Sequence, residues 1–145
     1  MAALFHVAFP MKNLDETKRF YVEGLGCALG RESTVALTLN LRGHQIVSQM
    51  TSESVKKPRS IYPHHFGLVL TTKEEWQAIL DRAKDKQLSF FQEPRIRFTG
   101  SPLEHHTFFL EDPAHNLLEF KHYTKESAIF GERDFGHVGD ADEPR

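Results

Sequence analysis

The stretch LFHVAFPMKNLDE (residues 4–16) decides the fold of this chain, because the stretch HHFGLVLTTKEE (residues 64–75) repeats its plan. Aligned without a gap, the two stretches coincide in three pairs that are 59 residues apart (65 − 6, 72 − 13 and 75 − 16): His6 with His65, Asn13 with Thr72, and Glu16 with Glu75. Self-similarity at one fixed spacing indicates two copies of the same supersecondary unit. We therefore expect two modules, over about 3–50 and 64–123.

Each module is predicted to begin with a strand and a capped helix. Alternating apolar residues predict strands over 3–11 and 64–71, with His6 and His65 on the face opposite the bulky side chains. Ala8 and Gly67, two residues further along the same face, are small and are expected to leave room for a cavity. After each strand, an N-cap residue is followed three positions later by glutamate, which is the capping-box pattern. Six bulky residues are expected between sheets and helices: Phe5, Phe9, Phe66, Leu68, Trp76 and Phe120.

Three further strands are expected in each module. They lie near 27–32, 34–41 and 44–50 in the first module, and near 88–98, 105–111 and 115–122 in the second. Residues 51–62 are polar and contain Pro58, so they are expected to form a linker between the modules.

Composition indicates a single domain over 1–124, followed by a C-terminal tail, 125–145, that is expected to be partly disordered. The net charge of −2 and the lack of a basic stripe argue against nucleic acid as a partner. No apolar run is long enough to span a bilayer, and the N-terminus lacks a secretory signal, so a cytoplasmic location without membrane contact is expected. Cys27 is the single cysteine, which excludes a disulfide framework and a zinc–cysteine cluster.

Two strand histidines and one carboxylate are the candidate metal ligands. His6 and His65 occupy equivalent places in the repeat, and Glu119 lies between Leu118 and Phe120, where it must face away from the apolar layer. Two histidines and one carboxylate can bind one face of an octahedral ion and leave positions open for substrate. The alternative is that the histidines are satisfied structural residues and that Glu119 is a solvated charge on an edge strand.

Other polar residues are candidates for binding or proton transfer. His105 and His106 precede a strand of the second module, and imidazole titrates near neutral pH, so both are candidates for acid–base work. Arg97 shares a strand face with Arg95 and could bind an anionic group of a substrate, although a solvated arginine ladder explains the pattern equally well.

Two motifs, FHVAFPMKNLDETKRFYVEGLGC (5–27) and FFLEDPAHNLLEFKHY (108–123), resemble those of the vicinal oxygen chelate superfamily. This superfamily includes glyoxalase I, bleomycin-resistance proteins, fosfomycin-resistance transferases and type I extradiol dioxygenases. The resemblance spans about residues 3–124. It implies an α+β fold, in which two βαβββ modules with curved mixed sheets enclose a metal and substrate cavity.

The resemblance also implies site residues. The family takes its metal ligands from strand positions that match His6, His65 and Glu119. Nitrogen and oxygen ligands admit Fe(II), Mn(II), Ni(II), Co(II) or Zn(II), and the sequence does not choose among these divalent ions. Dioxygenases of this type carry further catalytic histidine and tyrosine residues, for which His105 or His106, together with His122 and Tyr123, are possible counterparts.

One departure from the family pattern concerns a fourth protein ligand. Glyoxalase I enzymes take it from the last strand of the first module. The turns before the two last strands each carry a histidine, His44 and His115, which are 71 residues apart, and the same offset from Glu119 leads to Ser48. Neither Ser48 nor its neighbour Gln49 is a carboxylate, although the Gln49 amide could bind a metal or substrate weakly. The remaining three-ligand pattern is closer to that of the dioxygenases and fosfomycin-resistance enzymes.

The leading hypothesis is a metal-dependent, glyoxalase- or dioxygenase-like enzyme. Its small-molecule substrate would chelate the metal through adjacent oxygens, and dioxygenation, isomerisation and addition all remain open as the reaction. The first alternative is a metal-free protein of the bleomycin-resistance type that binds a small molecule or drug. A second is a structural or regulatory interaction module. A homodimer is compatible with each of these hypotheses.

Overall fold

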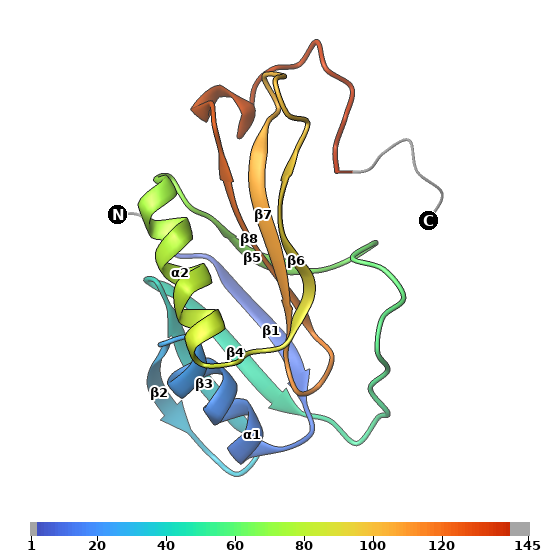
Figure 1. The fold of residues 1–145 in the computed structure, drawn as a ribbon. Coiled ribbons are helices and arrows are strands. Elements are labelled where there is room, and N and C mark those ends of the chain that lie inside the picture. Colours follow the sequence, from blue (N-terminus) through green and yellow to red (C-terminus); the bar gives the residue numbers. More distant parts are fainter. Residues whose placement is uncertain (1–2, 140–145) are drawn as a thin grey trace.

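A computed structural model describes residues 3–139 of the chain. The first module contains the helix α1 (Leu14–Lys18), which continues as a π-helical segment, η1 (Arg19–Gly24). Its strands are β1 (His6–Met11), β2 (Ala28–Glu32), β3 (Ala36–Leu41) and β4 (His44–Met50) (Figure 1).

The second module repeats this order after the linker. It contains the helix α2 (Lys73–Asp85) and the strands β5 (Phe66–Val69), β6 (Phe90–Arg97), β7 (His105–Glu111) and β8 (Leu117–Tyr123). A short 3-10 helix, η2 (Glu126–Ala128), follows. The expected pair of βαβββ modules is confirmed.

Each module forms one four-stranded mixed sheet. The strand order is β1-β4-β3-β2 in the first sheet and β5-β8-β7-β6 in the second. In both sheets the first strand of the module pairs in parallel with the last strand, whereas the other neighbours are antiparallel. This topology brings the strand that carries each repeated histidine next to the last strand of its own module.

Side-chain caps fix the start of both helices. The Asn13 side chain accepts a hydrogen bond from the backbone N–H of Glu16 at 2.9 Å, and the Thr72 hydroxyl accepts one from that of Glu75 at 3.2 Å. Each bond satisfies a backbone donor that has no partner within the first turn of a helix. The cap residues expected from the sequence are therefore confirmed.

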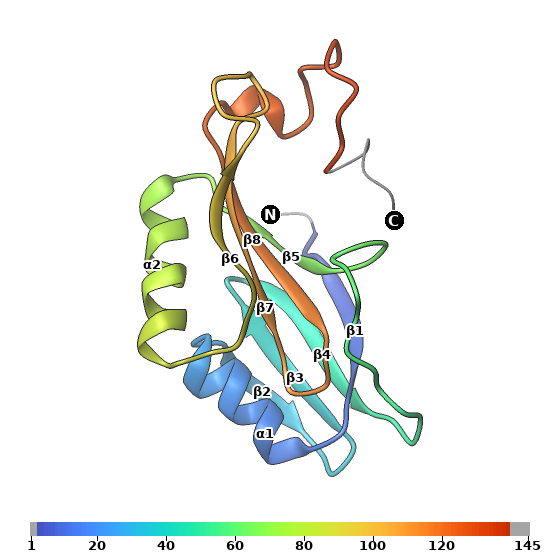
Figure 2. The same cartoon turned by 45° about the vertical axis from the view of Figure 1, so that its right-hand side comes forward.

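One core joins both sheets to both helices. The helices lie on the same side of the sheets, as Figure 2 shows, and the opposite strand faces are turned away from them. Phe9, Trp76 and Phe120 are buried in this core, and Phe66 and Leu68 pack against it. Phe5 was also expected there, but this expectation is wrong: it precedes β1, lies outside the core cluster and is 59% exposed.

Polar contacts also join the two modules. The Tyr21 hydroxyl donates a hydrogen bond to the Asp112 carboxylate at 2.6 Å, and the Arg82 guanidinium donates to the backbone carbonyl of Gly24 at 2.8 Å. The Asn116 side chain donates to the carbonyl of Pro10 at 2.9 Å. The Asp112 and Asn116 bonds fix the turn before β8 against η1 and β1, and the Arg82 bond fixes α2 against η1.

The linker and the C-terminal segment lie along the sheet faces that the helices leave uncovered. Residues 51–62 form no helix or strand, as expected, and Ile61 is buried against Phe109 and Leu117. Residues 129–139 contain no regular element, and the end of the predicted tail, 140–145, lies outside the described residues. No helix within 3–139 is long and apolar enough to cross a membrane.

Candidate functional site

The face of the second sheet that points away from α2 carries polar side chains at three levels. Strands β7 and β8 pair Glu111 with Leu117, Phe109 with Glu119, Thr107 with Lys121, and His105 with Tyr123. Side chains two residues apart share a face, so these residues line one surface. We call the level of Glu111 the lower level, that of Glu119 the middle level and that of His105 the upper level.

The middle level brings together two of the three predicted metal ligands. His65 Nε2 lies 3.2 Å from Glu119 Oε1. His65 Nδ1 lies 2.7 Å from the carbonyl of Ile61, and the Thr107 hydroxyl donates to Glu119 Oε2 at 2.6 Å. Hydrogen bonds on the far side of each group orient the donor atoms, as is usual around metal sites.

The middle level is electrostatically balanced without a metal. The hydrogen bond to Glu119 raises the pKa of His65, against the opposing effect of burial. Burial favours the protonated form of Glu119, but His65, Lys121 and Thr107 outweigh it and lower the pKa of this carboxyl. Glu119 is therefore ionised at neutral pH although it is only 8% exposed. The ammonium of Lys121, 3.8 Å from the carboxylate, places a positive charge beside it.

Gly67 determines how closely β5 approaches Glu119. A Cβ atom at Gly67 would lie 1.7 Å from the carbonyl oxygen of Glu119, a distance at which atoms overlap. The sequence suggested that the small residue leaves room for a cavity. The structure gives a different reason, because the space at Gly67 is filled by the backbone of β8.

His6, the third predicted ligand, lies apart from this pair within one chain. It is exposed, and its Nδ1 lies 2.8 Å from Oε1 of Gln45 on β4. Across residues 3–139, no three His, Cys, Asp or Glu side chains are close enough together to hold an ion. The expectation that all three ligands converge within a single chain is therefore not met.

Strand register places Val47 at the position in the first module that corresponds to Glu119. Gly67 pairs with Glu119, and Ala8, which aligns with Gly67 in the repeat, pairs with Val47. The offset is thus 72 and not 71, and Ser48 is not the counterpart. Ser48 is buried on the opposite face, and its hydroxyl lacks a hydrogen-bond partner among the described residues. Gln49 shares the outer face with His6 but lies opposite Pro10, so Gln45 is the residue that holds His6.

The upper level contains His105 and Tyr123, whose rings are 5.0 Å apart. His105 Nδ1 lies 2.9 Å from the carbonyl of Leu103, and burial lowers the pKa of this imidazole, so it is neutral at pH 7. Arg97, on β6, is the strand partner of His105, and its guanidinium lies over the ring of Phe98. A cavity of about 460 Å³, the tail cavity, is enclosed by this level and by parts of the segment 128–139.

His106 is directed away from the candidate site. Its ring lies 5.4 Å from that of Trp76 on α2 and 6.5 Å from that of His122. Adjacent residues of a strand point to opposite faces, so only one of His105 and His106 can reach the polar face. His105 and Tyr123 lie on that face, whereas His106 and His122 lie on the opposite one.

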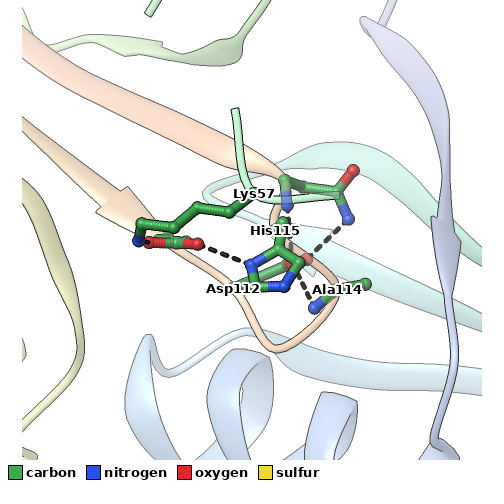
Figure 3. Close-up of polar contacts among 6 residues, drawn as sticks. Lys57, Asp112, Ala114 and His115 are labelled. Carbon is green, nitrogen blue, oxygen red and sulfur yellow. Dashed lines mark hydrogen bonds and ion pairs between the residues drawn. The ribbon is translucent and has the colours of Figure 1, made fainter. Parts of the chain in front are cut away.

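The lower level contains a group that the sequence pattern missed. The Glu111 carboxylate accepts hydrogen bonds from Lys57 in the linker and from His115 Nδ1, the latter at 2.6 Å. Figure 3 shows Lys57 and His115 meeting there, above the Asp112 turn. Lys57 comes from a segment without periodicity, so its partner had no sequence signal. His44 and His115, matched by spacing alone, make different contacts, because His44 Nδ1 accepts from the backbone N–H of Phe5.

A second cavity, the linker cavity, has a volume of about 510 Å³ and lies beside the middle and lower levels. Its wall is formed by β1, the linker, the start of β5 and the turn before β8. His65 and His115 both reach this wall. The candidate metal ligand and the lower level therefore share one space.

The family model described as the Glyoxalase/Bleomycin resistance protein/Dioxygenase superfamily matches residues 3–120. No match was found among curated proteins.

Solved structures share the fold along nearly the whole chain. A glyoxalase/bleomycin resistance protein/dioxygenase from Alicyclobacillus acidocaldarius has 37% sequence identity and a TM-score of 0.84, with 89% of this chain and 97% of that chain covered. The fosfomycin resistance protein FosX from Listeria monocytogenes has 16% identity and a TM-score of 0.67 (88% and 98% covered). Lactoylglutathione lyase from Agrobacterium tumefaciens has 15% identity and a TM-score of 0.64 (84% and 94% covered). The last two likenesses concern the fold.

Proposed function

Because this chain belongs to the Glyoxalase/Bleomycin resistance protein/Dioxygenase superfamily, we propose that it is a metal-dependent enzyme acting on a small molecule with two adjacent oxygens. The family includes several chemistries, so the proposal depends on the site and not on the fold. In this proposal His65 and Glu119 supply one nitrogen and one oxygen ligand.

The contact between His65 and Glu119 is the observation that carries the proposal. The two donor atoms are 3.2 Å apart, and each side chain is held from behind, by Ile61 and by Thr107. A histidine whose Nδ1–H donates to a carbonyl can bind a metal through the lone pair of Nε2, once the metal displaces any proton on Nε2. The residues therefore fit a divalent ion that accepts nitrogen and oxygen ligands.

The third ligand is proposed to be His6 of a second copy of the chain. His6 is exposed, and Gln45 holds its Nδ1 as Ile61 holds that of His65, so Nε2 is again the outward nitrogen. Two such sites would form in a symmetric dimer, because each copy offers His6 and also receives it. This arrangement explains why the ligand set is incomplete in one chain.

A divalent ion at this place would polarise the substrate oxygens and stabilise the negative charge that develops on them. The chain's own residues supply the remaining functions. Lys121 adds positive charge next to Glu119, and Arg97 lies at the same end of the site. The neutral imidazole of His105 is the proton acceptor that the upper level offers, with Tyr123 beside it.

The test is metal content after purification and after reloading with Mn(II), Fe(II) or Zn(II). Wild type should retain close to one ion per chain, whereas Glu119→Gln should lose metal affinity by orders of magnitude, because a neutral amide is a poor ligand. Glu93→Gln, which changes an exposed carboxylate on β6, is the matched control and should bind as wild type. Equal metal binding by Glu119→Gln would contradict the proposal.

A metal-free binding protein of the bleomycin-resistance type is the second candidate function. The observation that favours it is that Glu119 is already compensated by His65, Thr107 and Lys121, so the folded chain needs no ion. Under this alternative, wild type and Glu119→Gln would both lack metal, and a small ligand would bind equally well in the presence of a chelator.

A further inference from the structure

His115 has a backbone conformation that side chains rarely adopt. Its φ is +67°, in the left-handed region, where residues with a Cβ are disfavoured. Its side chain is nevertheless fixed, because Nδ1 bonds to Glu111 at 2.6 Å. Strained residues that the surroundings hold in place are concentrated at functional sites. The other ring nitrogen, Nε2, makes no hydrogen bond within residues 3–139, and the imidazole is part of the wall of the linker cavity.

The linker cavity combines an apolar body with a cationic side. Phe66, Pro10 and Leu117 form part of its wall, and the Phe66 ring packs at 5.1 Å on that of Phe9, which is buried in the core. Its volume of about 510 Å³ falls within the roughly 300–1,000 Å³ usual for small-molecule sites. An aromatic or alicyclic ring is the kind of group that such a wall receives.

The ionisable side chains that line this cavity are all basic. Lys56, Lys57 and three histidines line it, and no Asp or Glu among residues 3–139 does. Behind the wall, Glu111 compensates Lys57 and His115, and Glu119 compensates His65. Lys56 is exposed and forms no ion pair within the described part of the chain, so its charge remains available to a ligand.

We propose that the linker cavity binds a ring-bearing carboxylate, with the anionic group between Lys56 and His115 and the ring on Phe66. In this complex His115 is the imidazolium, which donates from Nδ1 to Glu111 and from Nε2 to the ligand. His65 lies in the same wall, so the far end of the ligand would reach the metal pair. As a statement about the substrate, this rests on the proposed function, but binding itself requires no metal.

The spacing of the levels agrees with such a ligand. The Glu111–Leu117 pair lies two strand residues from the Phe109–Glu119 pair, which is about 7 Å along the sheet. One or two fused rings with substituents at opposite ends span this length. A carboxylate held at the lower level therefore places the opposite end of the ring at the middle level.

The experiment measures binding of 2-naphthoate and of neutral 2-naphthalenemethanol to full-length, chelator-treated protein by calorimetry. Naphthoate should bind at least 10-fold more tightly than the alcohol. Lys56→Gln and His115→Asn should each weaken naphthoate binding about 5- to 10-fold and leave the alcohol unchanged, because charge-assisted hydrogen bonds are the stronger ones. Asparagine tolerates a positive φ, so the turn at position 115 should keep its shape.

Controls separate the possible failures. Lys73→Gln changes an exposed lysine that lies outside the cavity wall and should bind naphthoate as wild type does. The inference is overturned if naphthoate does not bind, if the alcohol binds equally well, or if both cavity variants behave as wild type. If the protein binds naphthoate but no metal, the proposed metal-dependent function is refuted and the cavity inference stands. If it binds metal but no naphthoate, the cavity inference is refuted and the proposed function stands.

Discussion

The two modules place equivalent strand positions in opposite environments. In the first module, His6 and Ala8 are exposed, and Val47 lies across from Ala8. In the second module, Glu119 occupies the position of Val47, is almost fully buried and contacts His65. The repeat therefore preserves the strands and the caps, whereas one face of the second sheet has become a polar site.

The proposed metal site uses groups from both modules, because each module offers only part of the ligand set. The first module offers a histidine to the outside, with its Nδ1 held by Gln45. The second module offers a histidine and a carboxylate in a partly enclosed space. A metal site shared between two copies of one chain requires two different faces, each of which carries only part of the ligand set.

The largest expected effect comes from exchanging the small residues of the two first strands. Gly67→Ala should cost about 3 kcal/mol or more, because its Cβ would overlap the carbonyl oxygen of Glu119 and separate β5 from β8. Ala8→Gly, at the matching position, should cost less than about 1 kcal/mol. Urea unfolding of both variants measures the difference, and similar costs would show that the modules do not differ at this pair.

The next effect concerns the turns that precede the last strands. Asp112→Ala should cost about 2–3 kcal/mol, because it leaves a buried tyrosine hydroxyl and two backbone N–H groups without their acceptor. In the first module, Asn40 accepts one exposed bond from Gly43, so Asn40→Ala should cost about 0.5–1 kcal/mol. Thermal unfolding of the pair tests this order, and a larger loss for Asn40→Ala would reverse it.

A smaller, pH-dependent effect is expected at Glu111. Burial favours the protonated form of this carboxyl, but bonds from Lys57 and His115 outweigh it and lower its pKa in the folded state. A lowered folded pKa contributes stability above the unfolded value of about 4.5, and this stability is lost as the pH falls through the folded pKa.

Glu111→Gln should therefore lower the free energy of unfolding by about 1 kcal/mol at pH 7, and the gap from wild type should close in acid. Glu32→Gln, which breaks the exposed Lys18–Glu32 pair of the first module, should have little effect at either pH. A Glu111→Gln gap that stays constant down to pH 3 would show that the carboxylate charge is not the cause.

Sequence analysis predicted the features that depend on local pattern. Period-two alternation identified β1 and β5, and the N-caps at Asn13 and Thr72 followed from residue type and spacing. Face alternation also placed His65 and Glu119 on the same side of the second sheet. The predicted burial of Phe5 was wrong because alternation does not show how far along a strand the core extends.

Features that depend on distant contacts were not predictable. Paired positions are nine residues apart in the first module (Thr38 and Val47) but ten apart in the second (Phe109 and Glu119), so a single offset misassigned Ser48. The cavity expected beside Gly67 was wrong, because the backbone that fills this space is 52 residues away in the sequence (119 − 67) and leaves no local signal. The contact of Lys57 with Glu111 joins two segments that share no pattern.

The most direct measurement of the central claim is complementation between two metal-deficient variants. His6→Ala and Glu119→Gln should each fail to retain a divalent ion when purified alone. After they are mixed and their subunits exchange, mixed dimers should regain one intact site, which corresponds to about a quarter of the wild-type metal content for random pairing. Metal retained by His6→Ala alone, or a complete absence of metal in the mixture once exchange is verified, would contradict a site shared between two copies.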